Sequence, residues 1–138
     1  MFERCLYFNS NALVRKVNRI WKDAYAELGL SPSHAYLLRL VLAQPGLSQN
    51  QIAVELQLEK STVTRFIDKM ETEGYLTRTV SKQRVTREQK IYPTDKAKAI
   101  HDRLEGISQR LYDQMRHIVG EDAMPTLVNE LREVAQAL

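Results

Sequence analysis

Apolar residues recur at intervals of three or four positions along most of this 138-residue chain, and that spacing predicts a set of amphipathic helices. One helix should begin at Ser48, because Gln51 follows three residues later in the pattern of a capping box. The apolar spacing then breaks near Gln57 and resumes at once. Two short helices joined by a turn of about three residues are typical of a helix-turn-helix pair.

The second helix of this pair should have one apolar and one polar side. Its apolar side follows the i, i+3, i+4, i+7 spacing and contains Val63, Phe66, Ile67 and Met70. Its polar side contains Ser61, Thr64, Arg65, Asp68, Lys69 and Thr72. Hydroxyl and guanidinium groups near a helix N-terminus can reach base edges while backbone N–H groups meet phosphate, as in a recognition helix. Any amphipathic surface helix also turns polar residues outward. The flanking sequence therefore has to distinguish a recognition helix from an ordinary surface helix.

The sequence after this helix predicts a basic hairpin. Gly74 should end the helix, and residues 75–80 are rich in strand-forming types. Between residues 74 and 92 five cations stand against one acid, a balance of +4, while the whole chain has a net charge of +3. A solvated charged loop is the alternative. A cationic hairpin directly after a recognition-type helix is better explained as a wing along the DNA backbone or in the minor groove.

These residues resemble the MarR family of winged-helix bacterial transcriptional regulators. The resemblance rests on the pattern L-x-x-x-x-S-T-V-T-R-x-I-D-x-M-E-x-x-G-Y-L from Leu56 to Leu76, on Arg78, and on Pro93-Thr94 before the next helix. It implies a mainly helical fold with a small β-hairpin wing, in which a winged helix-turn-helix lobe joins a dimerisation region of N- and C-terminal helices. The wing departs from the family, since residues 84–87 read R-V-T-R where members usually carry Asp-Arg-Arg.

Three segments follow from this interpretation. Residues 1–30 should form the N-terminal dimerisation helix, 31–93 the DNA-binding lobe, and 94–138 the C-terminal dimerisation helices of one intertwined domain. The first helix should run from Arg4 to Leu28. The second should start at Ser31-Pro32, since Ser is a good N-cap and Pro suits the first helical position. The apolar side expected for the second helix is Tyr36, Leu37, Leu40 and Val41.

The C-terminal segment predicts two further helices. Thr94 should cap one long helix with the apolar positions Ala97, Ile100, Leu104, Ile107, Leu111, Met115 and Ile118. Asp122 should cap a last helix with the apolar positions Met124, Leu127, Val128, Leu131, Val134, Ala135 and Leu138. A monomer of this size would struggle to cover these stripes, so we expect a homodimer in which each recognition helix reads half of a pseudo-palindromic site. An intramolecular helical bundle is the alternative.

Composition and motifs reduce the number of function classes that fit the chain. No apolar run is long enough to span a bilayer and no signal peptide is evident, so we expect a cytoplasmic protein without membrane contact. The single cysteine excludes an internal disulfide framework. The three histidines are scattered, and the chain has neither a metalloprotease pattern nor a glycine-rich phosphate loop. We therefore predict no catalytic residues, no metal site and no cofactor.

We expect a transcriptional regulator that binds double-stranded DNA sequence-specifically, and we expect it to be a repressor. The recognition helix should contribute Ser61, Thr62, Thr64, Arg65 and Lys69. The preceding helix should contribute Gln49 and Asn50, and the wing Arg78, Lys82, Arg84 and Arg87. Asp68 should pair with a neighbouring arginine, because a carboxylate facing phosphate is repelled. A winged-helix module that binds protein instead of DNA is the alternative.

The resemblance also implies regulation by a ligand. Many family members bind small aromatic or anionic molecules between the dimerisation region and the winged lobe, and some sense oxidants through a cysteine in the first helix. The residues that could line such a pocket here are Tyr7, Trp21, Tyr25, His34 and Tyr36, although aromatic residues at helical spacing are more often core. Cys5 is at the right end of the chain for a redox switch, but a lone cysteine is usually inert.

Overall fold

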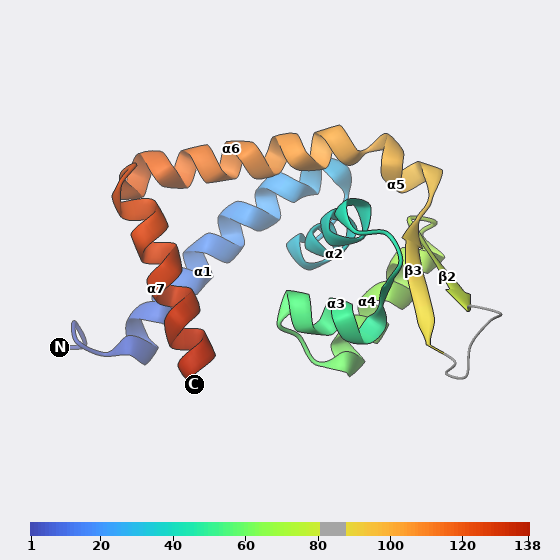
Figure 1. The fold of residues 1–138 in the computed structure, drawn as a ribbon. Helices are drawn as coiled ribbons and strands as arrows, with labels where there is room; N and C mark the ends of the chain where they lie inside the picture. The colour runs from blue at the N-terminus through green and yellow to red at the C-terminus, as the bar shows by residue number, and fades with distance from the viewer. Residues whose placement is uncertain (81–87) are drawn as a thin grey trace. The chain divides into compact units, whose positions relative to one another are not determined.

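The computed structural model describes residues 1–80 and 88–138 and is mainly helical (Figure 1). The elements, in chain order, are α1 (Leu6–Tyr25), η1 (Ala26–Leu28), α2 (Pro32–Ala43), β1 (Leu47–Ser48), α3 (Gln49–Leu56), α4 (Lys60–Thr72), β2 (Leu76–Val80), β3 (Gln89–Pro93), α5 (Asp95–Ala99), α6 (His101–Val119) and α7 (Ala123–Ala137). The chain divides into two compact units, residues 1–105 and 106–138. The mainly helical class with a small wing is confirmed.

The core of the first unit lies between α2, α3, α4 and the sheet. Its fully buried side chains come from all of these elements and include Leu37, Leu38, Val41, Ile52, Val63, Ile67, Met70 and Ile91. Burying a Leu, Ile or Met side chain stabilises a fold by about 1.5–3 kcal/mol relative to leaving it exposed. This core therefore fixes α3 and α4 against one another and leaves their outer sides free.

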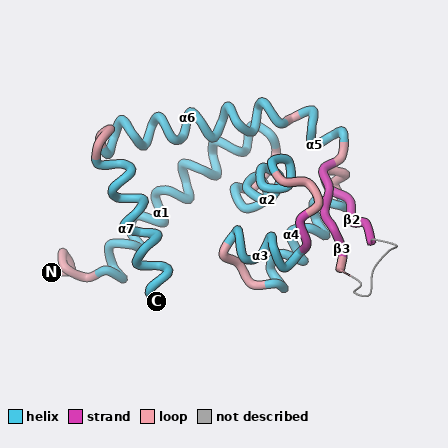
Figure 2. Tube along the Cα trace, viewed as in Figure 1, coloured by secondary structure: helices cyan, strands magenta, loops and turns pink. Residues whose placement is uncertain are grey.

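The strands form one antiparallel sheet in the order β1-β3-β2, seen in Figure 2 as magenta segments beside the helices of the lobe. Thr77 pairs with Tyr92 and Leu76 with Pro93 in the β2–β3 hairpin, which agrees with the predicted wing. The third strand, β1, was not predicted. It is only two residues long and pairs Leu47 with Ile91, so no alternating pattern in its own sequence marks it.

The second helix begins as predicted but buries a different side. Ser31 is its N-cap, and the hydroxyl accepts a hydrogen bond from the backbone N–H of His34. The buried residues are Ala35, Leu37, Leu38 and Val41, while Tyr36 is 39% exposed and Leu40 is half-buried. The expected apolar side is therefore wrong in half of its members. Because α2 contacts α1, α3, α4, α5 and β3, it is covered over a wider face than a four-residue stripe indicates.

The helix predicted after the wing is divided in two. Thr94 is the N-cap, as expected, and its hydroxyl accepts from the N–H of Ala97. The helix is interrupted at Ile100, whose N–H donates to the carbonyl of Ala97 in the tighter i to i+3 pattern. The expectation of one continuous helix is wrong here, because nothing in the apolar spacing distinguishes Ile100 from its neighbours.

The second unit contains the greater part of α6 and all of α7. Asp122 occupies the N-cap position of α7, as predicted, but its side chain makes no capping hydrogen bond. No residue of α7 is buried, and its apolar residues Leu127, Val128, Leu131 and Val134 are between 36% and 48% exposed. The predicted amphipathic helix therefore forms, but in the single chain its apolar side is exposed to solvent.

Candidate DNA-binding surface

The first helix of the predicted pair is fixed by its N-terminal cap. The Ser48 hydroxyl accepts from the N–H of Gln51 at 3.1 Å, and the Gln51 side-chain oxygen accepts from the N–H of Ser48 at 2.9 Å. The predicted capping box is confirmed, and Ser48 is fully buried. This cap places Gln49 and Asn50 in the first turn of α3, where Asn50 is exposed and Gln49 half-buried.

The turn between α3 and α4 consists of residues 57–59, the length predicted. Gln57 adopts the left-handed conformation with φ of 55°, and its N–H donates to the carbonyls of Ala53 and Val54. A left-handed conformation costs a residue other than glycine about 1–2 kcal/mol. The fold accepts this cost to redirect the chain into α4 within three residues, which completes the helix-turn-helix.

Helix α4 separates its apolar and polar residues as predicted. Val63, Ile67 and Met70 are fully buried, while Ser61, Arg65 and Lys69 are exposed. Thr62 and Thr64, which complete the expected contact set, are half-buried. Glu59 is at the N-cap but forms no side-chain capping hydrogen bond. The first backbone N–H groups of α4 therefore have no partner from this cap, which suits contact with phosphate.

Three side chains of the candidate surface differ in how tightly they are held. The Thr64 hydroxyl donates to the carbonyl of Lys60 at 2.9 Å and lies 3.4 Å from the side-chain oxygen of Gln49, so α3 and α4 meet at this point. Lys69 forms an ion pair with Glu73 at 3.5 Å. For Arg65 no ion pair exists among residues 1–80 and 88–138. Its guanidinium, on the exposed side of α4, is thus available to a partner.

Arg78 has a different environment from the one expected of a wing residue. Its guanidinium forms ion pairs with Asp68 and, at 2.8 Å, with Glu71, and its side chain is only 15% exposed. The expectation that Asp68 pairs with a neighbouring arginine is confirmed. Arg78 lies on β2 and both carboxylates lie on α4, so this network joins the β2–β3 hairpin to α4. The other wing cations of the prediction, Lys82, Arg84 and Arg87, lie outside the described residues.

Three of the five predicted effector residues lie together. The Trp21 indole N–H donates to the Tyr36 hydroxyl at 3.1 Å. The ring centroids of Tyr36 and the fully buried Tyr25 are 6.2 Å apart. The Arg39 guanidinium lies over the Tyr36 ring and donates two hydrogen bonds to Glu105, at 2.9 and 3.1 Å. These bonds hold the pKa of the Glu105 carboxyl below its usual range. Sequence reasoning missed this ion pair, since its partners are far apart in the chain.

The other two predicted effector residues lie elsewhere. His34 packs edge-on against the Phe66 ring of α4, with the ring centroids 5.0 Å apart. Burial, and then the charge of Lys69, lowers the pKa of His34 below its usual value. Tyr7 is 79% exposed near the start of α1. The thiol of Cys5 accepts a hydrogen bond from the N–H of Phe8 at 3.4 Å and so serves as the N-cap of α1.

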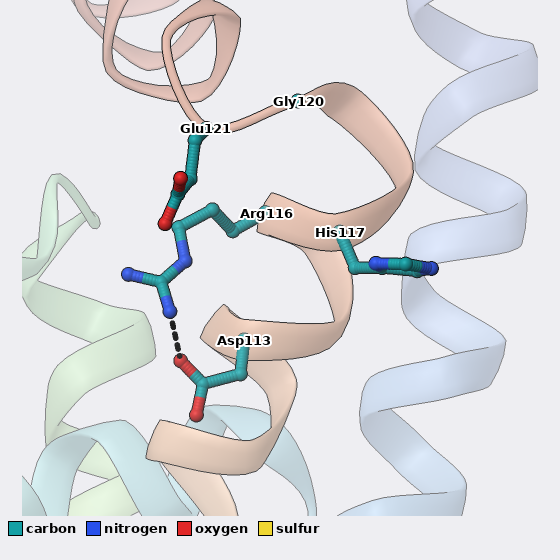
Figure 3. A pocket seen from close by; sticks show the side chains of 5 residues that line it. All are labelled: Asp113, Arg116, His117, Gly120 and Glu121. Carbon is teal, nitrogen blue, oxygen red and sulfur yellow. Dashed lines mark hydrogen bonds and ion pairs between the residues drawn. The ribbon is translucent and has the colours of Figure 1, made fainter.

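Two concavities of the chain are lined by other residues. One, of about 540 Å³, lies between the end of α1 and the start of α2 and is lined by Asn18, Lys22, Ala26, Gly29, Leu30, Ser31, Pro32 and Ser33. The other, of about 440 Å³, is in the second unit and is lined by Asp113, Arg116, His117, Gly120 and Glu121. Figure 3 shows Arg116 bonded to Asp113, while the His117 ring points away from this pair. Neither concavity includes a predicted effector residue.

Metal sites and membrane-spanning helices leave recognisable patterns in a structure. In residues 1–80 and 88–138 no three histidine, cysteine, aspartate or glutamate side chains are grouped so that they could hold a metal ion. Among the helices that the structure describes, none is long and apolar enough to cross a membrane.

The geometry defines a class of protein. A helix-turn-helix whose second helix has a buried apolar side and an exposed polar side, followed by an antiparallel hairpin, is a winged helix. Residues 28–87 match the model of the MarR family. None of the curated proteins compared with the chain matches it.

Solved structures of MarR-family regulators have the same fold over nearly the whole chain. MepR of S. aureus, in complex with DNA, is 19% identical with a TM-score of 0.87 and covers 99% of this chain and 100% of its own. PcaV of Streptomyces coelicolor, with its natural ligand, is 22% identical with a TM-score of 0.88 and corresponding coverages of 99% and 96%. The transcriptional repressor CouR, bound to a 23-mer DNA duplex, is 26% identical with a TM-score of 0.80 and coverages of 98% and 97%.

Proposed function

We propose that this protein is a transcriptional repressor without catalytic activity that binds a pseudo-palindromic operator as a homodimer and is released by a small molecule. The observation that carries the proposal is the exposed polar side of α4, which a fully buried apolar side holds in place. A helix that is anchored by its apolar side and exposes its polar side can insert into the major groove. A regulator of this kind acts in the cytoplasm, where the DNA is.

Each part of the surface has a proposed role. Arg65 reads a base or binds phosphate from the exposed side of α4. Further contacts with bases or phosphate come from its neighbours on the same helix, Ser61, Thr62, Thr64 and Lys69. Gln49 and Asn50 touch the DNA backbone from the first turn of α3. Lys82, Arg84 and Arg87 serve the wing, where a cationic loop meets the backbone or the minor groove.

The homodimer is supported by the open apolar sides of the terminal helices. Four apolar residues of α7 are more than a third exposed, and in α1 Leu6 and Leu13 are 62% and 47% exposed. Apolar surface of this extent is rare on a soluble monomer and marks an interaction site. A second copy of the chain is the occupant we propose, and a two-fold protein would place one recognition helix on each half of the operator.

The effector that we propose is a small aromatic or anionic molecule. The support is the group formed by Trp21, Tyr25 and Tyr36, which offers aromatic rings beside the Arg39 guanidinium. His34 and Tyr7 lie apart from this group and are weaker candidates. PcaV has been solved with its natural ligand, and CouR with p-coumaroyl-CoA at 23% identity, a TM-score of 0.86 and coverages of 99% and 96%.

The test is fluorescence anisotropy of the purified protein with its own upstream DNA and with a scrambled duplex, over a salt series. Light scattering after size exclusion gives the mass of the same sample. A dimer that prefers the native duplex by about a thousandfold or more, with an affinity that falls steeply with salt, is the expected result. Weak binding that treats both duplexes alike would favour a winged helix that binds protein, provided that selection from genome fragments also yields no preferred site.

A further inference from the structure

The end of the recognition helix requires hydrogen-bond donors from outside the helix. The N–H of Tyr75 donates to the carbonyl of Met70 at 2.8 Å, and the N–H of Gly74 donates to the carbonyl of Glu71 at 3.0 Å. With Gly74 at φ of 83°, this is a Schellman motif, as expected for a helix that ends in glycine. The motif leaves the carbonyls that follow, those of Glu73, Gly74 and Tyr75, without partners in α4.

All three of these carbonyls accept hydrogen bonds from residues 94–96, at the start of α5. The Lys96 ammonium donates to the carbonyl of Glu73 at 2.6 Å, and the Thr94 hydroxyl donates to that of Gly74 at 2.6 Å. The backbone N–H of Thr94 donates to the carbonyl of Tyr75 at 3.0 Å. We call these three bonds the α4–α5 clamp. The clamp joins segments about twenty residues apart in the chain and fixes the end of α4 to the beginning of α5.

Lys96 contributes to the clamp in two further ways. Its ammonium lies 4.4 Å from the centroid of the Tyr75 ring, within the range of a cation–π contact. Its positive charge also lies at the C-terminal end of α4, where the helix dipole favours a cation. Thr94 acts on both helices, because the hydroxyl that donates to Gly74 also accepts the N–H of Ala97 and so begins α5.

We propose that Lys96 is a positioning residue for DNA binding, which holds the end of α4 through the clamp and contacts no phosphate. This inference rests on the proposed function and adds a role for a cation outside the predicted contact set. Without the structure, Lys96 would be counted with the other cations of a basic lobe.

The test compares Lys96→Met with Lys96→Arg and with Lys98→Met. Lys98 lies on the same helix and is exposed, and within the described part of the chain its ammonium has no hydrogen bond or ion pair, so it controls for the loss of one charge. In anisotropy titrations, Lys96→Met should weaken binding to the operator about threefold to fivefold. The slope of log affinity against log salt should not change, whereas loss of a phosphate contact would reduce it by about one. Lys96→Arg should restore most of the affinity.

Hydrogen exchange of the DNA-free protein gives a second and independent result. The amides of Gly74 and Tyr75 should exchange about threefold faster or more in Lys96→Met and at the original rate in Lys98→Met. Unchanged exchange together with a reduced salt slope would make Lys96 a phosphate contact and overturn the inference. If the unsubstituted protein bound no DNA, the proposed function and the DNA role of Lys96 would both fail. Exchange would still decide whether Lys96 holds α4.

Discussion

Helices α4 and α7 have the same kind of sequence but opposite surroundings. Both place apolar residues at helical spacing along one side and polar residues along the other. In α4 that apolar side is closed, with Val63, Ile67 and Met70 fully buried. In α7 no residue is buried, and Leu131, near its middle, is 48% exposed.

The difference shows what an amphipathic pattern can and cannot say. The spacing correctly identifies a side that is too apolar for water, but it contains nothing about which surface covers that side. For α4 the cover is α2, α3 and β2 of the same unit. For α7 the proposed cover is a second copy of the chain. The two helices should therefore respond differently to the same kind of substitution.

The largest expected effect is on α4. Ile67→Ala should lower the free energy of unfolding by about 2–5 kcal/mol, because it leaves a cavity in a closed core. Leu131→Ala in α7, measured at a concentration where the protein is monomeric, should cost less than about 1 kcal/mol, as substitutions at exposed positions do. Chemical denaturation followed by circular dichroism measures both. Equal losses would mean that α7 is packed within the monomer, contrary to the comparison.

The second prediction concerns the proposed cover of α7. Leu131→Glu should convert the dimer to a monomer and weaken operator binding tenfold or more, which corresponds to about 1.4 kcal/mol or more, because a charge would be buried in the interface without a partner. Light scattering and anisotropy measure the two effects. Gln136→Glu adds the same charge to a polar position of α7 and should leave the mass unchanged. A Leu131→Glu protein that stays dimeric would place the interface elsewhere.

Local features of the sequence could be predicted, and contacts between distant segments could not. Ser48 with Gln51, and Gly74 at the end of α4, were found because a cap involves residues only a few positions apart. The pair of Arg39 with Glu105, the pairing of Leu47 with Ile91 and the bond from Thr94 to Gly74 depend on tertiary structure. The sequence likewise indicated aromatic residues in the first two helices, but not that Trp21 and Tyr36 meet while Tyr7 lies apart.

The third prediction separates the exposed side of α4 from the rest of the basic surface. Arg65→Ala should weaken operator binding by about 1–3 kcal/mol and relax specificity if the guanidinium reads a base. Arg103→Ala removes an exposed arginine of α6 outside the proposed surface and should change affinity little. Titrations against the operator and single-base variants measure both quantities. Equal weakening on every duplex would make Arg65 a phosphate contact instead.

The smallest expected effect is a pH dependence in the contact between α2 and α4. Burial against α4, and then the charge of Lys69, lowers the pKa of His34, while Glu73 opposes this shift. The folded state thus favours neutral His34, whereas the unfolded chain protonates near pH 6.5. Its contribution to stability should be complete above about pH 6.5 and be lost as the pH falls through the lowered pKa of the folded state.

Thermal denaturation between pH 7.5 and pH 5.5 measures this contribution. The fall in Tm over that interval should be smaller in His34→Gln than in the unsubstituted protein, by about 1–2 °C for a partly buried group. Lys69→Met should act in the same direction, because removal of the nearby cation raises the pKa of His34 and narrows the interval in which the two states differ. An unaltered pH dependence in His34→Gln would show that other groups cause it. The apolar contact of His34 with Phe66 would then be its main contribution to holding α4.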